Sequence, residues 1–83
     1  MGRDMQLNEA VSRRLLELLD AQGMTQYQLH LKSGVPKSTI RNLVNHAYPS
    51  VKLRVLHELC QAFGISLGDF FSSPLFKETN LEP

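Results

Sequence analysis

The residues with the clearest capacity for binding chemistry lie between Pro36 and Asn45. At about 100° per residue, an α-helix through this segment has one apolar face and one polar face. In the major groove of DNA, arginine and lysine suit the acceptors of guanine, and asparagine suits adenine. The pattern therefore predicts a helix that contacts base edges, and the alternative is a solvated polar face without a ligand. The apolar face carries Pro36, Ile40, Leu43 and Val44, and the polar face carries Ser38, Arg41, Asn42 and Asn45, with Lys37 on its flank.

The distribution of charge along the chain favours the first interpretation. The net charge of the whole sequence is +1, which taken alone argues against a nucleic-acid partner. Residues 21–57, however, hold five basic residues and no acidic residue, whereas residues 1–20 and 58–83 are each net negative. Because an idle protein surface usually mixes both signs, this cationic segment indicates an anionic partner. Its basic residues are Lys32, Lys37, Arg41, Lys52 and Arg54.

Length and composition limit the class of protein. A chain of 83 residues forms one domain with a small core. Its 42% apolar and 20% charged residues are ordinary for a soluble folded protein. The sequence has no apolar run of about 18 residues, which a membrane span requires, and no signal-peptide pattern. We therefore expect a cytoplasmic protein without a membrane partner.

The residues that could bind metals or act as nucleophiles do not form a recognisable site. Cys60 is the only cysteine, so no intramolecular disulfide can form. His57 and Cys60 share a helix face, but no second close pair completes a tetrahedral metal site. Cys60 lies on an apolar stripe and is expected in the core. Nucleophilic catalysis also needs an orienting third group and a cleft. We expect no enzyme activity, no metal and no cofactor.

Helical periodicity dominates the sequence, and no stretch alternates apolar and polar residues for long enough to predict a strand. A first helix is expected at about 9–22, capped by Asn8 and ended near Gly23. Thr25 and Gln28 form the pattern of a capping box, which predicts a second helix at 26–33. Gly34 can take the left-handed conformation that ends this helix.

The second half of the chain is also read as helical. A third helix is expected at 36–44, with Pro36 in its first turn. Residues 45–50 lack periodicity and form a loop, after which Ser50 can cap a fourth helix that ends at Gly64. A short last helix is expected after Ser66, reaching residue 70 or 71. The expected fold class is therefore all-α, a compact bundle of five helices.

The expected domain spans residues 8–72, between an N-terminal tail at 1–7 and a C-terminal tail at 73–83. Phe70 or Phe71 is expected to complete the core. The C-terminal tail becomes ordered only if Leu75 and Phe76 find a surface. The aromatic residues that the core does not use could form a dimer contact.

Three segments of the chain resemble the helix-turn-helix regulators of the Cro and phage-repressor type, the XRE family. These segments are residues 25–29, residues 33–43 and residues 59–67, and the match covers roughly residues 8–72. The resemblance implies a five-helix, lambda-repressor-like domain with its helix-turn-helix at the second and third helices. It also implies that the third helix enters the major groove of a double-stranded DNA operator.

The resemblance also implies the roles of individual residues. Lys37, Ser38, Arg41 and Asn42 match positions that contact bases, and Gln26, Thr39 and Asn45 match positions that contact the DNA backbone. A helix N-terminus favours anions, so a phosphate near Gln26 is physically reasonable. We therefore expect sequence-specific DNA binding by a transcriptional regulator, a repressor that acts as a homodimer.

Three positions depart from the family pattern. His30 stands where the family has a small residue between the two helices, which predicts a looser or shifted packing. Leu31 stands at a usually polar position and either packs against the first helix or faces a partner. Asn45 and His46 replace the usual asparagine and glycine at the end of the third helix.

The alternative function is a protein-interaction module, such as an antitoxin that neutralises a partner protein. Leu31 and the hydrophobic C-terminal tail motivate this interpretation. The two functions differ in salt dependence, because DNA binding releases counterions and weakens steeply as the salt concentration rises.

Overall fold

The computed structural model describes residues 5–48 and 50–81. These residues form five α-helices and one 3₁₀ turn, and no strand. The all-α class predicted from the sequence is confirmed. None of the helices in this part of the chain has the length and apolar character needed to cross a membrane. In order, the elements are α1 (Leu7–Ala21), α2 (Gln26–Ser33), α3 (Lys37–Val44), α4 (Leu53–Phe63), α5 (Leu67–Phe71) and η1 (Pro74–Phe76).

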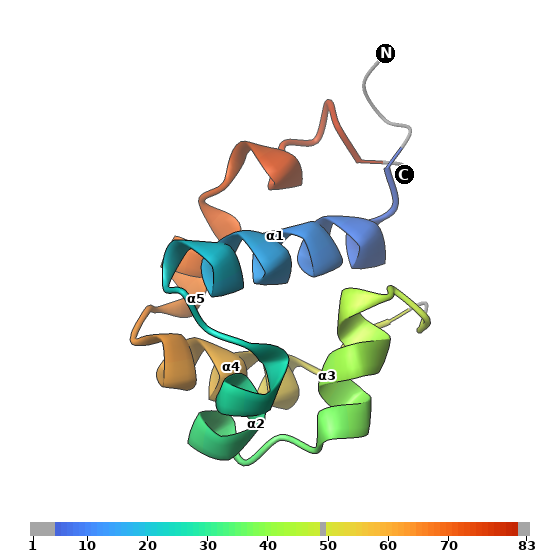
Figure 1. The fold of residues 1–83 in the computed structure, drawn as a ribbon. Coiled ribbons are helices and arrows are strands. Elements are labelled where there is room, and N and C mark those ends of the chain that lie inside the picture. Colours follow the sequence, from blue (N-terminus) through green and yellow to red (C-terminus); the bar gives the residue numbers. More distant parts are fainter. Residues whose placement is uncertain (1–4, 49, 82–83) are drawn as a thin grey trace.

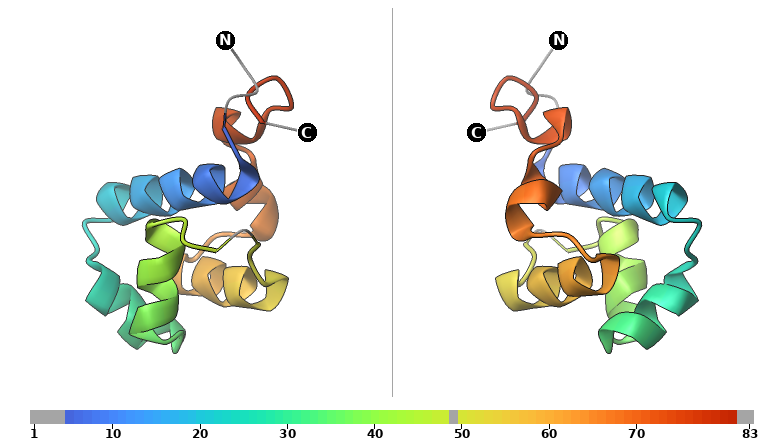
Figure 2. Two further views of the ribbon diagram at one scale, coloured as in Figure 1. Left: turned by 90° about the vertical axis from the view of Figure 1, so that its right-hand side faces the viewer. Right: turned by 90° about the vertical axis from the view of Figure 1, so that its left-hand side faces the viewer.

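The longest helix, α1, lies in the middle of the molecule. In Figures 1 and 2, α2, α3 and α4 lie on one side of it, and the segment that follows α5 lies on the other. The contacts agree with this view, since α1 touches both α3 and η1. The molecule measures 37 × 22 × 21 Å, with a radius of gyration of 12.2 Å. Every other element is therefore positioned directly or indirectly by α1.

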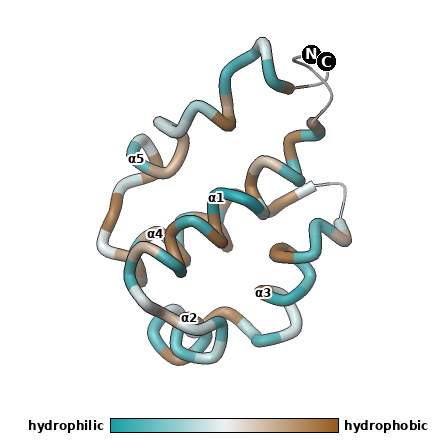
Figure 3. Tube along the Cα trace, turned by 45° about the horizontal axis from the view of Figure 1, so that its top comes forward, coloured by the Kyte–Doolittle hydropathy of each residue, from teal (hydrophilic) through white to brown (hydrophobic). Residues whose placement is uncertain are grey.

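Each α-helix contributes a fully buried side chain to one core. Each helix carries both hydrophobic and hydrophilic residues, as expected of a helix with one apolar face toward the core (Figure 3). Cys60 is also fully buried, which confirms its expected place in the core. Phe70 completes the core, also as expected. One large side chain without exposed surface comes from each helix: Leu15, Leu29, Ile40, Leu59 and Phe70.

Local capping signals predicted the ends of α2 and α5 correctly. The hydroxyl of Thr25 accepts a hydrogen bond from the amide of Gln28, and the Gln28 side chain accepts one from the amide of Thr25. Gly34 ends α2 in the left-handed region, with φ of 77°. Ser66 and Asp69 form a second capping box at the start of α5. The residues of each capping box lie within four positions of one another, so the sequence alone is enough to recognise the motif.

Three other predicted helix starts were wrong. Asn8 does not cap α1, which begins at Leu7; its side chain donates hydrogen bonds to a distant loop instead. Ser50 does not cap α4, because Val51 packs against the core and the chain stays extended through Lys52. Pro36 precedes the first turn of α3 rather than lying in it.

The segment after α5 folds back on the rest of the chain. Ser73 accepts a hydrogen bond from the amide of Leu75 and so caps η1. The ring of Phe76 packs against the core and meets the ring of Phe71 edge to face, with 4.8 Å between centroids. Phe76 therefore finds its surface on the protein itself, and Leu75 is half-buried. Farther along, Leu81 forms an isolated parallel bridge with Met5.

Arg14 joins α1 to the end of α5. Its guanidinium donates hydrogen bonds to the carbonyl oxygens of Phe70 and Asp69, each at 2.8 Å. It also lies 6.0 Å from the centroid of the Phe70 ring. The last carbonyls of a helix lack partners within that helix, so a cation here satisfies two of them and interacts favourably with the helix dipole.

We expect Arg14→Ala to lower the free energy of unfolding by about 2 kcal/mol, because two charged hydrogen bonds are lost. Arg13→Ala is the matched control. Arg13 is exposed and its contact is an ion pair with Glu9, so its loss should cost less than about 0.5 kcal/mol. Urea denaturation of both variants measures the difference. Equal losses would show that Arg14 contributes no more than a surface charge.

Candidate nucleic-acid interface

The turn between α2 and α3 is tightly bonded. Val35 is buried, and its carbonyl oxygen lies 2.7 Å from Nδ1 of His30. Because a carbonyl can only accept, Nδ1 must carry the hydrogen. His30 is half-buried and adds a contact across the turn, where a looser or shifted packing was predicted. The relative orientation of α2 and α3 is fixed by this bond and by the left-handed Gly34.

The other end of α3 is held by side chains of α1. The hydroxyl of Ser12, which is 3% exposed, donates a hydrogen bond to the carbonyl of Val44. Nδ2 of Asn8 donates to the carbonyls of His46 at 3.2 Å and Tyr48 at 2.7 Å. Sequence reasoning missed Ser12. The available signal was its spacing of four residues from Asn8, which puts both polar side chains beside the apolar stripe of α1.

The predicted base-contacting residues all lie on α3, away from its buried face. Ile40 and Leu43 are buried, whereas Lys37, Ser38 and Arg41 are exposed. Asn42 is half-buried, and its Nδ2 donates a hydrogen bond to the hydroxyl of Tyr48 at 2.7 Å.

The predicted backbone-contacting residues are more dispersed. Gln26 is exposed at the first residue of α2, and Asn45 is exposed just after α3. Lys37 connects the two helices, since its Nζ lies 5.4 Å from the centroid of the Tyr27 ring on α2. Thr39 is half-buried and faces the opposite flank of α3.

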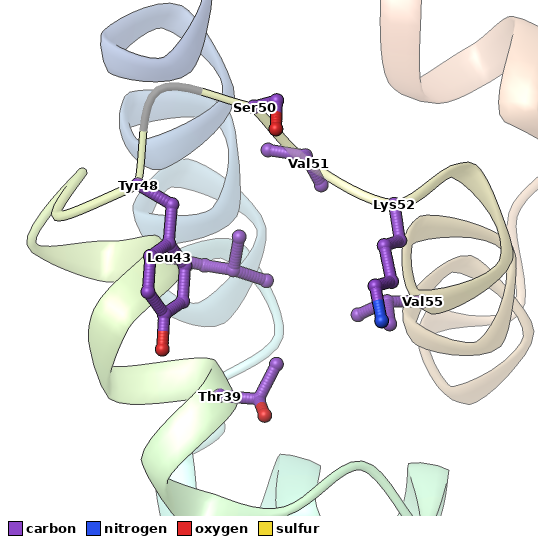
Figure 4. A pocket seen from close by; sticks show the side chains of 7 residues that line it. All are labelled: Thr39, Leu43, Tyr48, Ser50, Val51, Lys52 and Val55. Carbon is purple, nitrogen blue, oxygen red and sulfur yellow. The ribbon is translucent and has the colours of Figure 1, made fainter.

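On that flank, a hollow of about 380 Å³ lies between α3 and the start of α4. Figure 4 shows Thr39 and Tyr48 on one wall and Lys52 and Val55 on the other. Tyr48 was not among the residues predicted from the sequence. A lone tyrosine in a polar loop carries no motif, so only the folded loop reveals its contact with Asn42.

The end of α3 explains the departure at Asn45 and His46. The amide of Ala47 donates to the carbonyl of Asn42, and the amide of His46 donates to that of Leu43. This pair of bonds is a Schellman motif, whose central residue takes a left-handed conformation and is usually glycine. His46 occupies this place with φ of 39°. The loop therefore follows the geometry of the asparagine–glycine pattern with a histidine in place of glycine.

We expect His46→Gly to raise the free energy of unfolding by up to about 1 kcal/mol, because relief of the left-handed strain exceeds the entropy added to the unfolded chain. His57→Gly is the control, since His57 is exposed on α4 in ordinary helical geometry. That substitution should destabilise by roughly 0.5 kcal/mol. Thermal unfolding of both variants measures whether each substitution raises or lowers the free energy of unfolding. Destabilisation by both would mean that His46 is unstrained.

The remaining candidates for chemistry lie away from this surface. Burial raises the pKa of the Cys60 thiol, partly offset by the positive charge of Arg14. The thiol therefore stays protonated at neutral pH. Within residues 5–48 and 50–81, no three histidine, cysteine or acidic side chains gather closely enough to hold a metal ion.

Two short helices joined at a left-handed glycine, the second with a buried inner face and a polar outer face, define a helix-turn-helix. The family model of the Cro/C1-type HTH DNA-binding domain matches residues 14–74. The chain belongs to this family of DNA-binding domains, and the resemblance recognised in the sequence is confirmed. Among curated proteins, none matches the chain.

Two solved proteins share the fold. The crystal structure of the prophage Lp1 protein 11 is similar over 94% of this chain and 99% of that one, with 28% identity and a TM-score of 0.75. The wild-type restriction-modification controller protein C.Esp1396I is 22% identical, with a TM-score of 0.73, over 82% of this chain and 87% of its own. A mutant of that controller protein gives 23% identity and the same TM-score, over 81% and 86% of the two chains.

Proposed function

We propose that this protein is a sequence-specific transcriptional repressor that reads double-stranded DNA by placing α3 in the major groove. The observation that carries the proposal is the position of α3. Its inner face is buried by Ile40 and Leu43, its two ends are held by hydrogen bonds, and its outer face is polar and free of acidic residues. A protein bound in this way blocks the access of other proteins to the same base pairs.

The outer residues of α3 suit distinct base edges. Arg41 can donate two hydrogen bonds to O6 and N7 of guanine. Asn42 can pair with N6 and N7 of adenine. Lys37 and Ser38, in the first turn of α3, can reach further edges. Together these four residues would supply the sequence preference, while the small net charge of +1 limits non-specific attraction.

The proposed phosphate contacts lie around this face. Gln26 is the first residue of α2, where backbone amides without helical partners favour an anion. Asn45 is exposed at the far end of α3, and Thr39 lines the hollow toward Lys52. Contacts of this kind set the register of a protein on DNA without reading the sequence.

The test compares a base-contacting residue with a phosphate-contacting one. Arg41→Ala should cost about 1–3 kcal/mol of binding free energy at one base position of a selected operator. Gln26→Ala should weaken binding to all sequences evenly. Arg13→Ala, on the exposed side of α1, should leave binding unchanged. Fluorescence anisotropy with operators carrying single base changes measures all three variants.

The wild-type protein should also lose affinity steeply as salt rises. If Arg41→Ala and Gln26→Ala both leave operator affinity untouched, the placement of α3 is wrong. Salt-insensitive DNA binding together with a stoichiometric protein partner would support the alternative function, an interaction module such as an antitoxin. One observation favours that alternative: Leu31 is 61% exposed, so it does not pack against α1.

We further propose that the protein acts as a homodimer. A single eight-residue recognition helix reads few base pairs, and two-fold dimers read two half-sites. Phe76 packs on its own chain and Leu75 is half-buried, so we place the dimer contact elsewhere. Phe71 is 39% exposed and borders a hollow that two more exposed leucines also line: Leu7 at 56% and Leu53 at 65%.

Leu53→Glu should therefore weaken self-association by at least about tenfold, because dimerisation would bury an unpaired carboxylate. Leu31→Glu is the matched control, since Leu31 is similarly exposed but lies on α2. Sedimentation equilibrium measures both. If only Leu31→Glu abolishes the dimer, the interface lies on α2 instead.

A further inference from the structure

Tyr48 lies in the loop after α3, and two contacts fix its position. Its carbonyl oxygen accepts a hydrogen bond from Nδ2 of Asn8 at 2.7 Å, so α1 holds its backbone. Its hydroxyl accepts a hydrogen bond from Nδ2 of Asn42, also at 2.7 Å. In Figure 4 the ring extends along α3, with the hydroxyl on the side of Thr39. The side chain is 47% exposed, so it is open to a ligand on this face.

The hydrogen bond to Tyr48 limits what the Asn42 amide can offer to DNA. A carboxamide has two N–H donors and one oxygen acceptor. One N–H is used by Tyr48, which leaves one N–H and Oδ1. Adenine requires this combination, because its N7 accepts a hydrogen bond and its N6 donates one. The amide held by Tyr48 therefore matches adenine without rearrangement.

The hydrogen bond between Asn42 and Tyr48 also disfavours a contact between Asn42 and guanine. Guanine presents two acceptors, O6 and N7, in the major groove. A free asparagine amide could turn both of its N–H groups toward them. With one N–H held by Tyr48, a single donor remains, and Oδ1 would face an acceptor. The guanine complex then loses a hydrogen bond or must break the bond to Tyr48.

We propose that Tyr48 is a positioning residue that makes Asn42 select adenine over guanine. This inference rests on the proposed function, in which Asn42 contacts a base. Tyr48 acts through the orientation of the Asn42 amide rather than by contacting the base itself. The preference for one base pair thus depends on a loop residue that α1 holds in place.

The test uses Tyr48→Phe, which keeps the ring and removes only the hydroxyl. The base pair read by Asn42 is first located as the position where Asn42→Ala loses discrimination in sequences selected from random DNA. At that position Tyr48→Phe should lower the adenine-to-guanine affinity ratio by about fivefold or more, within the range of a bidentate base contact. In the Asn42→Ala background the same change should have no effect on the ratio, because the two residues act as one unit.

Tyr27→Phe is the matched control, because Tyr27 is the other tyrosine of the chain and lies on α2. It should leave the adenine-to-guanine ratio unchanged. A second measurement needs no DNA: in the free protein, Tyr48→Phe should shift the side-chain amide resonances of Asn42, and Tyr27→Phe should not. Thermal unfolding confirms that the variants remain folded.

Two outcomes would overturn the inference while leaving the proposed function standing. In the first, Tyr48→Phe weakens binding to every sequence evenly, which identifies Tyr48 as a phosphate contact. In the second, the ratio and the Asn42 resonances stay unchanged. Failure of the proposed function has a different signature, since the wild-type protein would then show no salt-sensitive preference for any DNA sequence.

Discussion

The hydrogen bonds from Ser12 and Asn8 to the end of α3 are the contacts on which the rest of the surface depends. An eight-residue helix is too short to be stable by itself in water, so its position must come from tertiary contacts. Ile40 and Leu43 bury its inner face, but apolar packing alone is not directional. The bonds from α1 add direction, because each satisfies a particular carbonyl at the C-terminus of the helix or in the loop behind it.

The same helix organises the opposite end of the molecule. Two residues after Ser12, Arg14 satisfies the final carbonyls of α5, which brings Phe70 into the core and leaves a surface for Phe76. Polar side chains of α1 therefore satisfy the ends of two other helices. This arrangement lets a small core position five helices, since helix ends that would otherwise need water are bonded within the protein. It also couples the loop that holds Tyr48 to the body of the fold.

Charge is separated in the molecule as it is in the sequence. The cationic segment contributes Lys37 and Arg41 to the exposed side of α3, and Lys52 and Arg54 to the start of α4. Within the residues that the structure describes, the acidic side chains lie on α1, α4 and α5 and at Glu78. A protein of net charge +1 with exposed basic residues on α3 and at the start of α4 attracts DNA weakly and mainly toward these two helices. In the proposed function, selectivity then comes from a few well-held side chains rather than from total charge.

The sequence by itself determined the features that depend on neighbours along the chain. Thr25, Gln28 and Gly34 bound α2 because a capping box and a left-handed glycine act within one helical turn. The apolar periodicity placed Ile40 in the core, whereas the choice between Phe70 and Phe71 was left to the fold. The residues of α3 proposed to contact bases could be chosen in the same way, from their common face. Only the tertiary structure assigned the contacts between distant segments. Asn8 bonds to Tyr48 rather than capping its own helix, Leu31 stays exposed, and Tyr48 meets Asn42, because each outcome depends on which segments the fold brings side by side.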